Sequence, residues 1–282
     1  MHFKHIAIVG VGLIGGSFAL AARRAGVAER ITGWDRKEVL DEACARRIID
    51  GVEESFASAK VCDADLVYLA MPVGEIISFL RSGTTLLKSD VIVTDAGSTK
   101  REICRAAREG LAREVAFVGG HPMAGSENAG FEFAVADLFH DAPYALVADE
   151  KVDAKALKAI AEVVRAIGGK PIMLRAEQHD RIAARISHSP QMISTALALA
   201  IARRSEVETL ALAGSGFEEM TRLARSRWSV WENICRTNAD EISAALDEAI
   251  TEIEAVRVAI SSGDFTSLGE MFDSAGEFAR GR

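Results

Sequence analysis

Two segments of the chain place side chains suited to proton transfer directly after apolar runs. The segment DAGSTK (95–100) contains Ser98, which either caps the helix that follows or hydrogen-bonds a ligand. The segment HPMAGSE (121–127) begins with His121, and an imidazole exchanges protons readily near neutral pH. A single histidine is often structural, but the proline and glycine beside His121 indicate a shaped loop. This pattern is typical of a histidine that exchanges a proton with a substrate hydroxyl.

A third group of polar side chains lies in the second half of the chain. It comprises the segment SHSP (187–190), the segment GFEEMTR (216–222), Trp231 and Asn238. Arg222 could grip a carboxylate with two parallel hydrogen bonds, which a lysine cannot do. Trp231 would then form a wall of the same pocket. The alternative is a surface arginine beside a core tryptophan.

The N-terminal region contains the pattern of a dinucleotide-binding turn. An apolar run precedes the motif GVGLIG, and a helix-compatible stretch follows it. Gly10 permits a tight turn, Gly12 lets the backbone approach a pyrophosphate, and Gly15 lets the helix pack close to the strand. The helix N-terminus, at Leu13 and Ile14, then offers N–H groups to the phosphates.

Two further features extend this predicted cofactor site. Asp35 lies 20 residues beyond Gly15, where a carboxylate accepts hydrogen bonds from a ribose 2′-hydroxyl. A 2′-phosphate would meet a like charge there, which favours NAD over NADP, although the neighbouring Arg36 could bind such a phosphate. Met71 and Pro72 end a later strand, so we expect them at the same crevice.

Alternating strands and helices must position these residues. The strand candidates in the first 174 residues are apolar on both faces, as in a parallel sheet covered by helices on each side. They are Ile6–Gly10, Arg30–Trp34, Leu66–Met71, Val91–Asp95, Val115–Gly120, Tyr144–Val147 and Pro171–Leu174. Helix candidates between them include Ile14–Ala25, Thr99–Glu109 and Ala154–Ile167. The pattern predicts an α/β fold with a doubly wound, Rossmann-type parallel sheet, whose ligand crevice lies at the carboxyl ends of the strands.

The chain changes character after Leu174, where long helix-favouring stretches begin and no convincing strand follows. We predict a dinucleotide-binding domain, 1–174, and an all-helical substrate and dimerisation domain, 175–282. An apolar stripe at helical spacing runs through Ile242, Leu246, Ile250, Ile253, Val256 and Ile260. It either packs within its domain or forms a subunit interface, and we favour a homodimer. We expect the final segment, 263–282, to fray.

Composition and charge exclude several classes of protein. Hydrophobic residues make up 49% and charged residues 26% of the chain, which is ordinary for a soluble globular protein. The net charge of −8 leaves no basic excess for binding nucleic acid. No apolar stretch is long enough to span a membrane, and the N-terminus leaves no room for a signal peptide. The four cysteines have no CxxC spacing, which indicates buried thiols of a cytoplasmic protein and no metal site.

Six motifs in order resemble the prephenate/arogenate (cyclohexadienyl) dehydrogenase family of tyrosine biosynthesis. They are GVGLIGGS, GWDR, DAGSTK, HPMAGSE, SHSP and GFEEMTRLARSRWSVW, from about residue 5 to about residue 240. The resemblance implies an NAD-dependent oxidoreductase with a dinucleotide-binding domain and a helical dimerisation domain. The implied reaction is oxidative decarboxylation of prephenate to 4-hydroxyphenylpyruvate, or of arogenate to tyrosine. The implied partners are this small-molecule substrate and a second copy of the chain, with no nucleic acid or membrane.

The resemblance also implies roles for residues of the first half. His121 resembles the acceptor of the proton of the ring hydroxyl. Ser98 resembles the residue that orients that hydroxyl, His121 and the nicotinamide. Glu127 resembles a polar residue that shapes the substrate pocket, and Ser126 beside it belongs to the same loop.

In the second half, His188 resembles a contact to the substrate side chain, and Arg222 the partner of a substrate carboxylate. Trp231 resembles a residue that lines the same pocket. The chain departs from the family pattern at Gln191, where a second histidine is expected, and at Trp228, where a proline is common. Prephenate and arogenate both stay open as the substrate.

Two other classes of protein are alternatives to this family. Hydroxyacid dehydrogenases and imine reductases also join a glycine-fingerprint domain to a helical domain, but several of them are expected to place a catalytic lysine in the helical half. This chain has no lysine between Leu174 and Arg282. A non-catalytic NAD-binding sensor would keep the cofactor residues Gly10, Gly12, Gly15 and Asp35. It would have no use for the combination of Ser98, His121, His188 and Arg222.

Overall fold

The computed structural model describes residues 2–53, 62–82, 87–125, 130–148, 152–204 and 208–281. Contacts divide the chain into two compact units. The first unit is Met1–Ala183 with Arg225–Asn238, and the second unit is Ala184–Ala224 with Ala239–Arg282. The domain limits of 1–174 and 175–282 stay a prediction.

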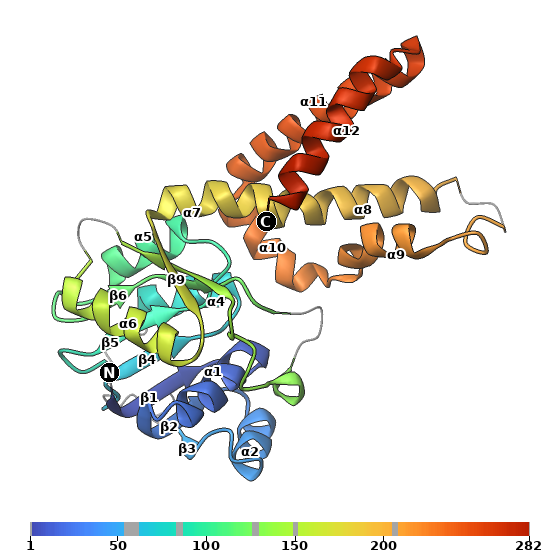
Figure 1. The fold of residues 1–282 in the computed structure, drawn as a ribbon. Coiled ribbons are helices and arrows are strands. Elements are labelled where there is room, and N and C mark those ends of the chain that lie inside the picture. Colours follow the sequence, from blue (N-terminus) through green and yellow to red (C-terminus); the bar gives the residue numbers. More distant parts are fainter. Residues whose placement is uncertain are drawn as a thin grey trace. The chain divides into compact units, whose positions relative to one another are not determined.

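A six-stranded parallel sheet forms the centre of the first unit (Figure 1). Its order is β3-β2-β1-β4-β5-β6, and every pair in it is parallel. The strands are β1 (Phe3–Val9), β2 (Ala28–Trp34), β3 (Gly51–Val52), β4 (Leu66–Leu69), β5 (Ile92–Asp95) and β6 (Ala116–Val118). The order reverses between β1 and β4, and a doubly wound sheet binds its ligand at such a point. The predicted Rossmann-type fold is confirmed, although the short strand β3 was not predicted.

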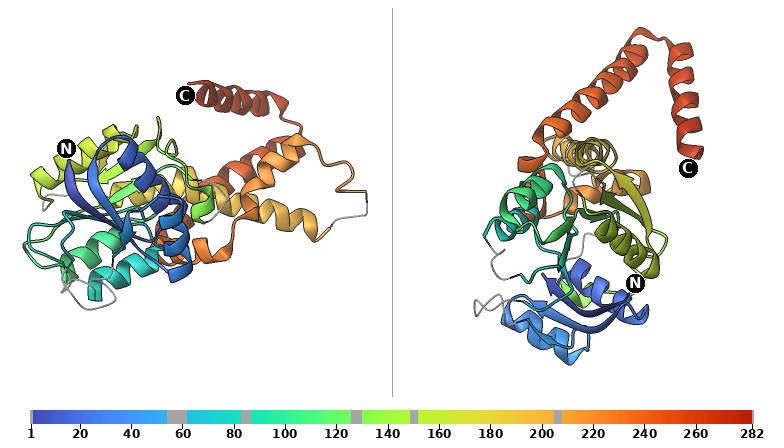
Figure 2. Two further views of the ribbon diagram at one scale, coloured as in Figure 1. Left: turned by 90° about the horizontal axis from the view of Figure 1, so that it is seen from below. Right: turned by 90° about the vertical axis from the view of Figure 1, so that its left-hand side faces the viewer.

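Helices lie on both sides of this sheet (Figure 2). Because alternate side chains of a strand point to opposite faces, β1 contributes to two cores. Ile6 and Ile8 pack in one core with α1, α2 and α6, and Ala7 and Val9 pack in the other with α4 and α5. These helices are α1 (Leu13–Arg24), α2 (Lys37–Ala45), α4 (Val73–Ser82), α5 (Arg101–Gly110) and α6 (Ala154–Ala166). The three helices predicted here have their observed limits within two residues of the predicted ones.

The last two predicted strands do not belong to the parallel sheet. They form a separate three-stranded sheet of β7 (Gly120–Pro122), β8 (Pro143–Val147) and β9 (Lys170–Leu174). β7 is antiparallel to β8, and β8 is parallel to β9. The chain leaves the large sheet at Gly119, and a Cβ atom at Gly120 would lie 2.6 Å from the carbonyl oxygen of Asp95. The expectation of one parallel sheet that includes Tyr144–Val147 and Pro171–Leu174 is therefore wrong, because this glycine pair redirects the chain.

Helices follow β9 to the end of the described chain, and no strand occurs among the described residues there, as predicted. α7 (Ala176–Ala183) and α10 (Trp228–Thr237) belong to the first unit. The second unit contains the short helix η3 (Ala184–His188), and α8 (Ser189–Ala202), α9 (Ser215–Thr221), α11 (Ala239–Ser262) and α12 (Phe265–Arg280). The short helix η4 (Arg222–Arg225) belongs to it except for its last residue, Arg225.

The expectation that the final segment frays is wrong, because it forms α12. Asp264 caps this helix by accepting a hydrogen bond from the backbone N–H of Ser267, at 3.0 Å. Phe265, Leu268 and Phe272 recur along it at helical spacing. A local cap and an apolar stripe therefore outweigh the glycines of this segment.

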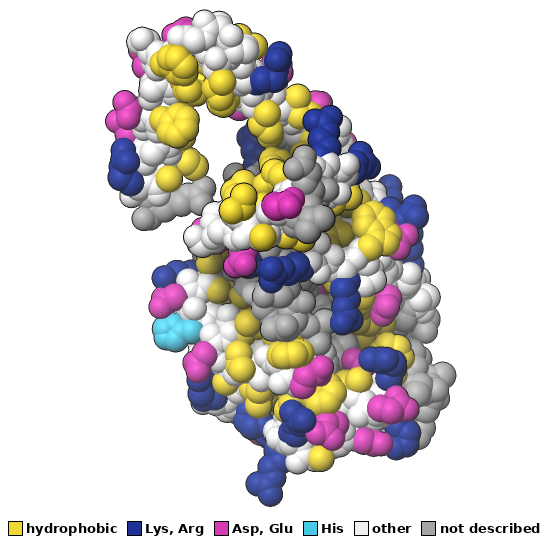
Figure 3. Space-filling view, turned by 90° about the vertical axis from the view of Figure 1, so that its right-hand side faces the viewer, with side chains coloured by type: hydrophobic (Ala, Val, Ile, Leu, Met, Phe, Trp, Pro, Cys, Tyr) yellow, Lys and Arg dark blue, Asp and Glu magenta, His cyan; other side chains and the backbone are white. Residues whose placement is uncertain are grey.

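The α11–α12 hairpin exposes an apolar surface within the second unit (Figure 3). On α11, the predicted stripe leaves Ile250 60% and Ile253 58% exposed. On α12, Phe272 and Phe278 are 71% and 70% exposed. Large exposed apolar side chains on both helices make this hairpin a candidate interaction surface.

All four cysteines are free thiols, as predicted, but only Cys62 and Cys104 are buried, and Cys44 and Cys235 are half-buried. Within the described ranges, no helix combines the length and the hydropathy that crossing a membrane requires.

Candidate functional site

The glycine motif forms the turn that joins β1 to α1. Gly10 has a φ angle of +93°, which favours glycine. A Cβ atom at Gly15 would lie 2.0 Å from the carbonyl oxygen of Gly10, so only glycine permits this approach of helix to strand. At Gly12, the N-cap of α1, a Cβ atom would have no neighbour within 4 Å, and no side chain caps the helix. An open turn and an uncapped helix N-terminus fit the pyrophosphate of a dinucleotide.

Asp35 lies beside this turn, at the end of β2. Its carboxylate accepts hydrogen bonds from the backbone N–H of Val11, at 2.7 Å, and from that of Arg36, also at 2.7 Å. Each carboxylate oxygen has a second lone pair, so the group can still accept a ribose hydroxyl. Arg36 is exposed and lies 3.9 Å from Asp35, measured from its Nε to Oδ1.

A pocket of about 960 Å³ extends from the glycine turn along the carboxyl ends of the strands. It is lined by Gly10, Val11, Gly12, Trp34, Asp35, Arg36, Val39, Ala70, Met71, Pro72, Glu75, Gly130, Phe131, Glu132 and Arg227. The predicted cofactor residues Met71 and Pro72 therefore share one cavity with the turn. Arg227, which precedes α10, adds a cation that the sequence reasoning did not assign. α10 packs close to α4. A Cβ atom at Gly74 would lie only 2.6 Å from the side-chain oxygen of Asn233, so a larger residue there would require a shift.

The end of β5 is held by a buried ion pair. Asp95 and Lys100 are fully buried and form a salt bridge. Asp95 also accepts hydrogen bonds from the backbone N–H of Gly97, at 2.8 Å, and of Gly120, at 3.0 Å. Lys100 donates to the carbonyl oxygen of Gly120, at 2.8 Å. The loop that carries Ser98 and the strand that carries His121 are therefore tied to one ion pair.

Ser98 is half-buried between Gly97 and Thr99. It does not cap α5, which begins at Arg101. Instead, the carboxylate of Asp180 accepts hydrogen bonds from the backbone N–H of Lys100, at 2.6 Å, and of Arg101, at 3.0 Å. The capping alternative for Ser98 is therefore wrong, and its role at the hydroxyl of a substrate stays a prediction.

His121 is buried in β7 and belongs to a chain of three side chains. Its Nδ1 lies 2.8 Å from Nε2 of His179, and Nδ1 of His179 lies 2.8 Å from Oδ1 of Asp180. The two imidazole rings meet edge to face, with centroids 5.1 Å apart. His179 is 3% exposed and Asp180 is fully buried. The contact with His179 fixes the position of Nδ1 of His121.

The carboxylate at the end of this chain is stabilised in its charged form. Burial alone would raise the pKa of Asp180, but hydrogen bonds from His179 and from the backbone N–H of Arg101 and Lys100 lower the pKa below its usual value. Nε of Arg101 lies 3.3 Å from Oδ2 of Asp180 and adds positive charge. Asn238 donates to the carbonyl oxygen of Asp180, at 2.9 Å. Asp180 is therefore an ionised and fixed acceptor.

His188 and Arg222 belong to the second unit. His188 is buried where the π-helical turn η3 meets α8, and Arg222 is exposed at the start of η4. Gln191, the departure from the family pattern, is buried and donates to the carbonyl oxygen of Leu223, at 2.8 Å. The structure therefore uses Gln191 to fix the turn that carries Arg222.

Three other predicted site residues lie elsewhere. Trp231 is half-buried on α10, in the first unit. Ser126 and Glu127 lie outside the described residues. The roles predicted for all three stay predictions.

The polar residues that hold His121 in place were not predicted from the sequence. His179 and Asp180 are adjacent on α7, 58 residues beyond His121, and nothing local marks their contact with it. The signal that could have found them is a histidine–aspartate pair directly after the last strand of an α/β region.

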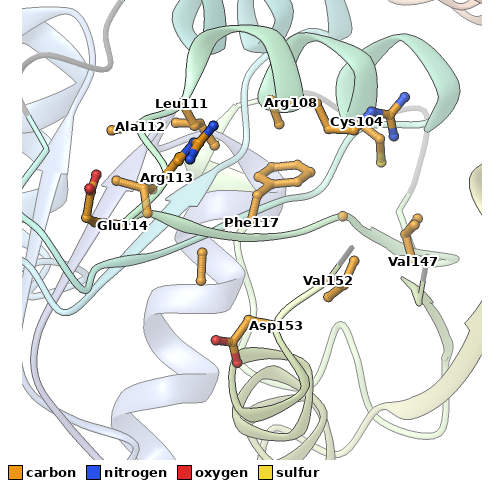
Figure 4. A pocket seen from close by; sticks show the side chains of 14 residues that line it. Cys104, Arg108, Leu111, Ala112, Arg113, Glu114, Phe117, Val147, Val152 and Asp153 are labelled. Carbon is orange, nitrogen blue, oxygen red and sulfur yellow. The ribbon is translucent and has the colours of Figure 1, made fainter. Parts of the chain in front are cut away.

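The first unit also has a separate cavity of about 380 Å³ between α5, β6 and the start of α6 (Figure 4). Phe117 forms part of its wall, and Arg108, Arg113 and Asp153 lie around it. Among the described residues, none of the predicted site residues lines this cavity. We assign no role to it.

Two sequence families match the chain. The family described as prephenate dehydrogenase, nucleotide-binding domain, matches residues 18–173. The family described as prephenate dehydrogenase, dimerization domain, matches residues 175–274. Together these matches span most of the chain.

Curated relatives and solved structures agree with these two family matches. Cyclohexadienyl dehydrogenase of Zymomonas mobilis is 34% identical, over 96% of this chain and 93% of that protein. Prephenate dehydrogenase of Bacillus subtilis is 31% identical, over 98% of this chain and 75% of that protein. The crystal structure of prephenate dehydrogenase from A. aeolicus with hydroxyphenyl propionate and NAD+ has a TM-score of 0.91 at 29% identity, covering 98% of this chain and 96% of that chain.

Arogenate dehydrogenase from Synechocystis has a TM-score of 0.81 at 28% identity, covering 96% of this chain and 97% of that chain. A 3-hydroxyisobutyrate dehydrogenase from Salmonella typhimurium, of the class considered as an alternative, has a TM-score of 0.59 at 16% identity and shares the fold alone. The chain belongs to the prephenate dehydrogenase family.

Proposed function

We propose that this protein is an NAD-dependent dehydrogenase that oxidatively decarboxylates prephenate or arogenate. Family membership and the relatives named prephenate, cyclohexadienyl and arogenate dehydrogenase support the reaction class. The observation that carries the proposal is the buried His121, held through Nδ1 and tied by Gly120 to the carboxyl end of β5. A hydroxyl group of a ring is the substrate group that such an imidazole serves.

The residues of the cofactor pocket support NAD. The turn at Gly10 and Gly12 and the N-terminus of α1 suit the pyrophosphate, and the Asp35 carboxylate suits an unphosphorylated ribose. NAD, when bound, supplies the acceptor for the hydride that leaves the ring carbon bearing the hydroxyl. Arg227, on the wall of the same pocket, adds a positive charge for the phosphates.

In the proposed mechanism, the chain orients the substrate and moves one proton. His121 accepts the proton of the ring hydroxyl as the oxygen becomes carbonyl-like, and Ser98 orients that hydroxyl. The ring carboxylate leaves as carbon dioxide, and the ring becomes aromatic. Because aromaticity provides the driving force, positioning and polarisation are what the protein must supply.

Substrate recognition is assigned to the residues that the family resemblance singled out. The resemblance assigns Arg222 to a substrate carboxylate and His188 to the substrate side chain. It assigns Trp231, Ser126 and Glu127 to substrate binding as well. Prephenate carries a keto group where arogenate carries an ammonium, so the choice depends on polar groups near the substrate side chain.

We also propose a homodimer that forms through the α11–α12 hairpin. The matching family is described as a dimerization domain, and the hairpin exposes large apolar side chains on both of its helices. Burying such surface against a second copy is the simplest way to remove it from water.

The substitution His121→Asn tests the role of His121. It removes the proton acceptor, so kcat should fall by about 10²–10⁴-fold while NAD binding is retained. Turnover is followed by absorbance of reduced nicotinamide, and NAD binding by quenching of protein fluorescence. The exposed His140, replaced by Asn, is the control and should keep normal turnover. Near-normal turnover of His121→Asn would remove His121 from the mechanism.

A further inference from the structure

We infer that His179 and Asp180 are positioning residues that fix His121 in the one tautomer able to accept the substrate proton. This inference rests on the proposed function, because it concerns the same histidine. It adds two residues of α7 that neither the motifs nor the family matches assign. The three side chains form an unbroken hydrogen-bonded chain inside the first unit.

The donor and the acceptor in each of these hydrogen bonds follow from Asp180, the acceptor at the end of the series. An ionised carboxylate can only accept, so Nδ1 of His179 must carry a proton and donate it to Oδ1 of Asp180, at 2.8 Å. With one proton on each ring, Nε2 of His179 is then the acceptor for Nδ1–H of His121, also at 2.8 Å. His121 consequently keeps a lone pair on Nε2, which is what a proton acceptor needs.

Asp180 is well suited to set this direction because donors hold both of its carboxylate oxygens. Oδ1 accepts from the backbone N–H of Lys100, and Oδ2 from the backbone N–H and Nε of Arg101. Asn238 donates to its backbone carbonyl oxygen, at 2.9 Å. These contacts come from α5 and from the residue after α10, so two elements hold the group in addition to its own helix.

His179 and Asp180 also stabilise the imidazolium of His121 that the proton transfer produces. When the hydroxyl O–H bond breaks and an N–H bond forms at Nε2, His121 becomes an imidazolium and one positive charge appears. The carboxylate of Asp180 stabilises that charge through the ring of His179, without itself gaining a proton. The neighbouring charges are Arg101, which pairs with Asp180, and Lys100, which is already neutralised by Asp95.

Two substitutions of His179 separate positioning from mere packing. His179→Gln keeps an acceptor toward His121 and a donor toward Asp180, whereas His179→Leu keeps only the volume. We expect kcat of His179→Leu to fall by about 10²-fold, with KM and NAD affinity within about twofold of the wild type. His179→Gln should recover kcat to within about tenfold. The exposed His140→Leu is the control and should not change kcat.

The pH profile provides a second readout. Without the carboxylate acting through His179, the imidazolium of His121 loses stabilisation, so the acidic limb of the kcat/KM profile should move to lower pH in His179→Leu. If kcat of His179→Leu stays within about twofold of the wild type, or if both variants lose kcat, NAD affinity and melting temperature together, the inference is wrong.

Nitrogen-15 NMR of the histidine rings tests the tautomer in the protein without substrate, so its result does not depend on the proposed reaction. We expect His121 to carry its proton on Nδ1 in the wild type and to lose this preference in His179→Leu. A proton on Nε2 of His121 in the wild type would overturn the inference. If the tautomer is as expected but no substrate turns over, the proposed function fails and the positioning chain stands.

Discussion

The polar centre of the first unit, formed by Asp95, Lys100 and Asp180, differs from the α11–α12 hairpin of the second unit. The first has its charges paired within one copy of the chain, and the second leaves apolar side chains exposed. In the first unit, the buried charges of Asp95, Lys100 and Asp180 have partners within that unit. On the hairpin, Phe272 and Phe278 remain about 70% exposed. A polar centre whose charges are paired within its own unit thus contrasts with an apolar surface that one copy of the chain leaves exposed.

From this difference we expect the buried charge pairs to contribute to folding and the exposed apolar side chains to contribute to association. Buried charges are costly unless they are paired, so Asp95 and Lys100 must be satisfied as the unit folds. Apolar side chains such as Phe272 tolerate water until association buries them. Substitutions in the polar centre should therefore affect stability and chemistry, and substitutions on the hairpin should affect assembly.

The largest expected effect on stability comes from breaking the buried ion pair. Lys100→Met leaves Asp95 buried without its cation, which should cost about 3–5 kcal/mol in the free energy of unfolding. Lys88→Met is the matched control, because Lys88 pairs with Asp65 at a partly exposed position and should cost at most about 1 kcal/mol. Urea unfolding measures both. Equal costs for the two variants would contradict the account of a buried, stabilising pair.

The next effect concerns assembly. Phe272→Asp puts a charge on the apolar surface of α12 and should weaken the dimer by roughly 2–4 kcal/mol, with little change in the fold of the unit. Phe133, an exposed phenylalanine of the first unit, is the control, and Phe133→Asp should leave the dimer intact. Analytical ultracentrifugation over a range of concentrations reports the dissociation constant. A dimer that is indifferent to Phe272→Asp would place the interface elsewhere.

A smaller effect is expected at the substrate carboxylate. Arg222→Gln removes a charge-assisted hydrogen bond worth roughly 1.5–3 kcal/mol, so KM should rise by about 10- to 150-fold with a lesser change in kcat. Arg225, on the same short helix η4, is the control for general loss of positive charge. Steady-state kinetics of Arg222→Gln and Arg225→Gln measure both. An unchanged KM for Arg222→Gln would return Arg222 to the role of a surface residue.

The smallest effect is a pH dependence of stability. The pKa of Asp180 is held below its usual value, so its ionised form stabilises the fold above pH 4 and this contribution is lost as the pH falls further. The stability gap between the wild type and Asp180→Asn should therefore narrow by on the order of 1 kcal/mol between pH 6 and pH 3. Chemical unfolding at both values measures it. A gap that widens toward acid would contradict the ionised state of Asp180.

Local patterns allowed most of the first unit to be predicted. The turn at Gly10–Gly15 and the carboxylate of Asp35 lie within one βαβ segment, so their spacing alone indicates the cofactor site. His121 was expected in a loop after the strand Val115–Gly120, but it lies within β7, so that prediction is wrong. The division of the strand Val115–Gly120 between two sheets could not be predicted, because it depends on the contact of Gly120 with Asp95.

The residues that were missed depend on contacts between distant segments. His179 meets His121 across 58 residues, and Lys100 meets Asp180 across 80. The spacing of residues along the sequence does not reveal such distant contacts. The opposite error occurred at α12, where the glycines were given more weight than the cap at Asp264.

The most direct test of the account combines the purified protein with prephenate or arogenate and with NAD or NADP, and follows the absorbance of reduced nicotinamide. We expect turnover of at least one substrate with NAD, with one carbon dioxide released for each reduced nicotinamide formed. No turnover in any of these pairings, from a protein that binds NAD, would contradict it.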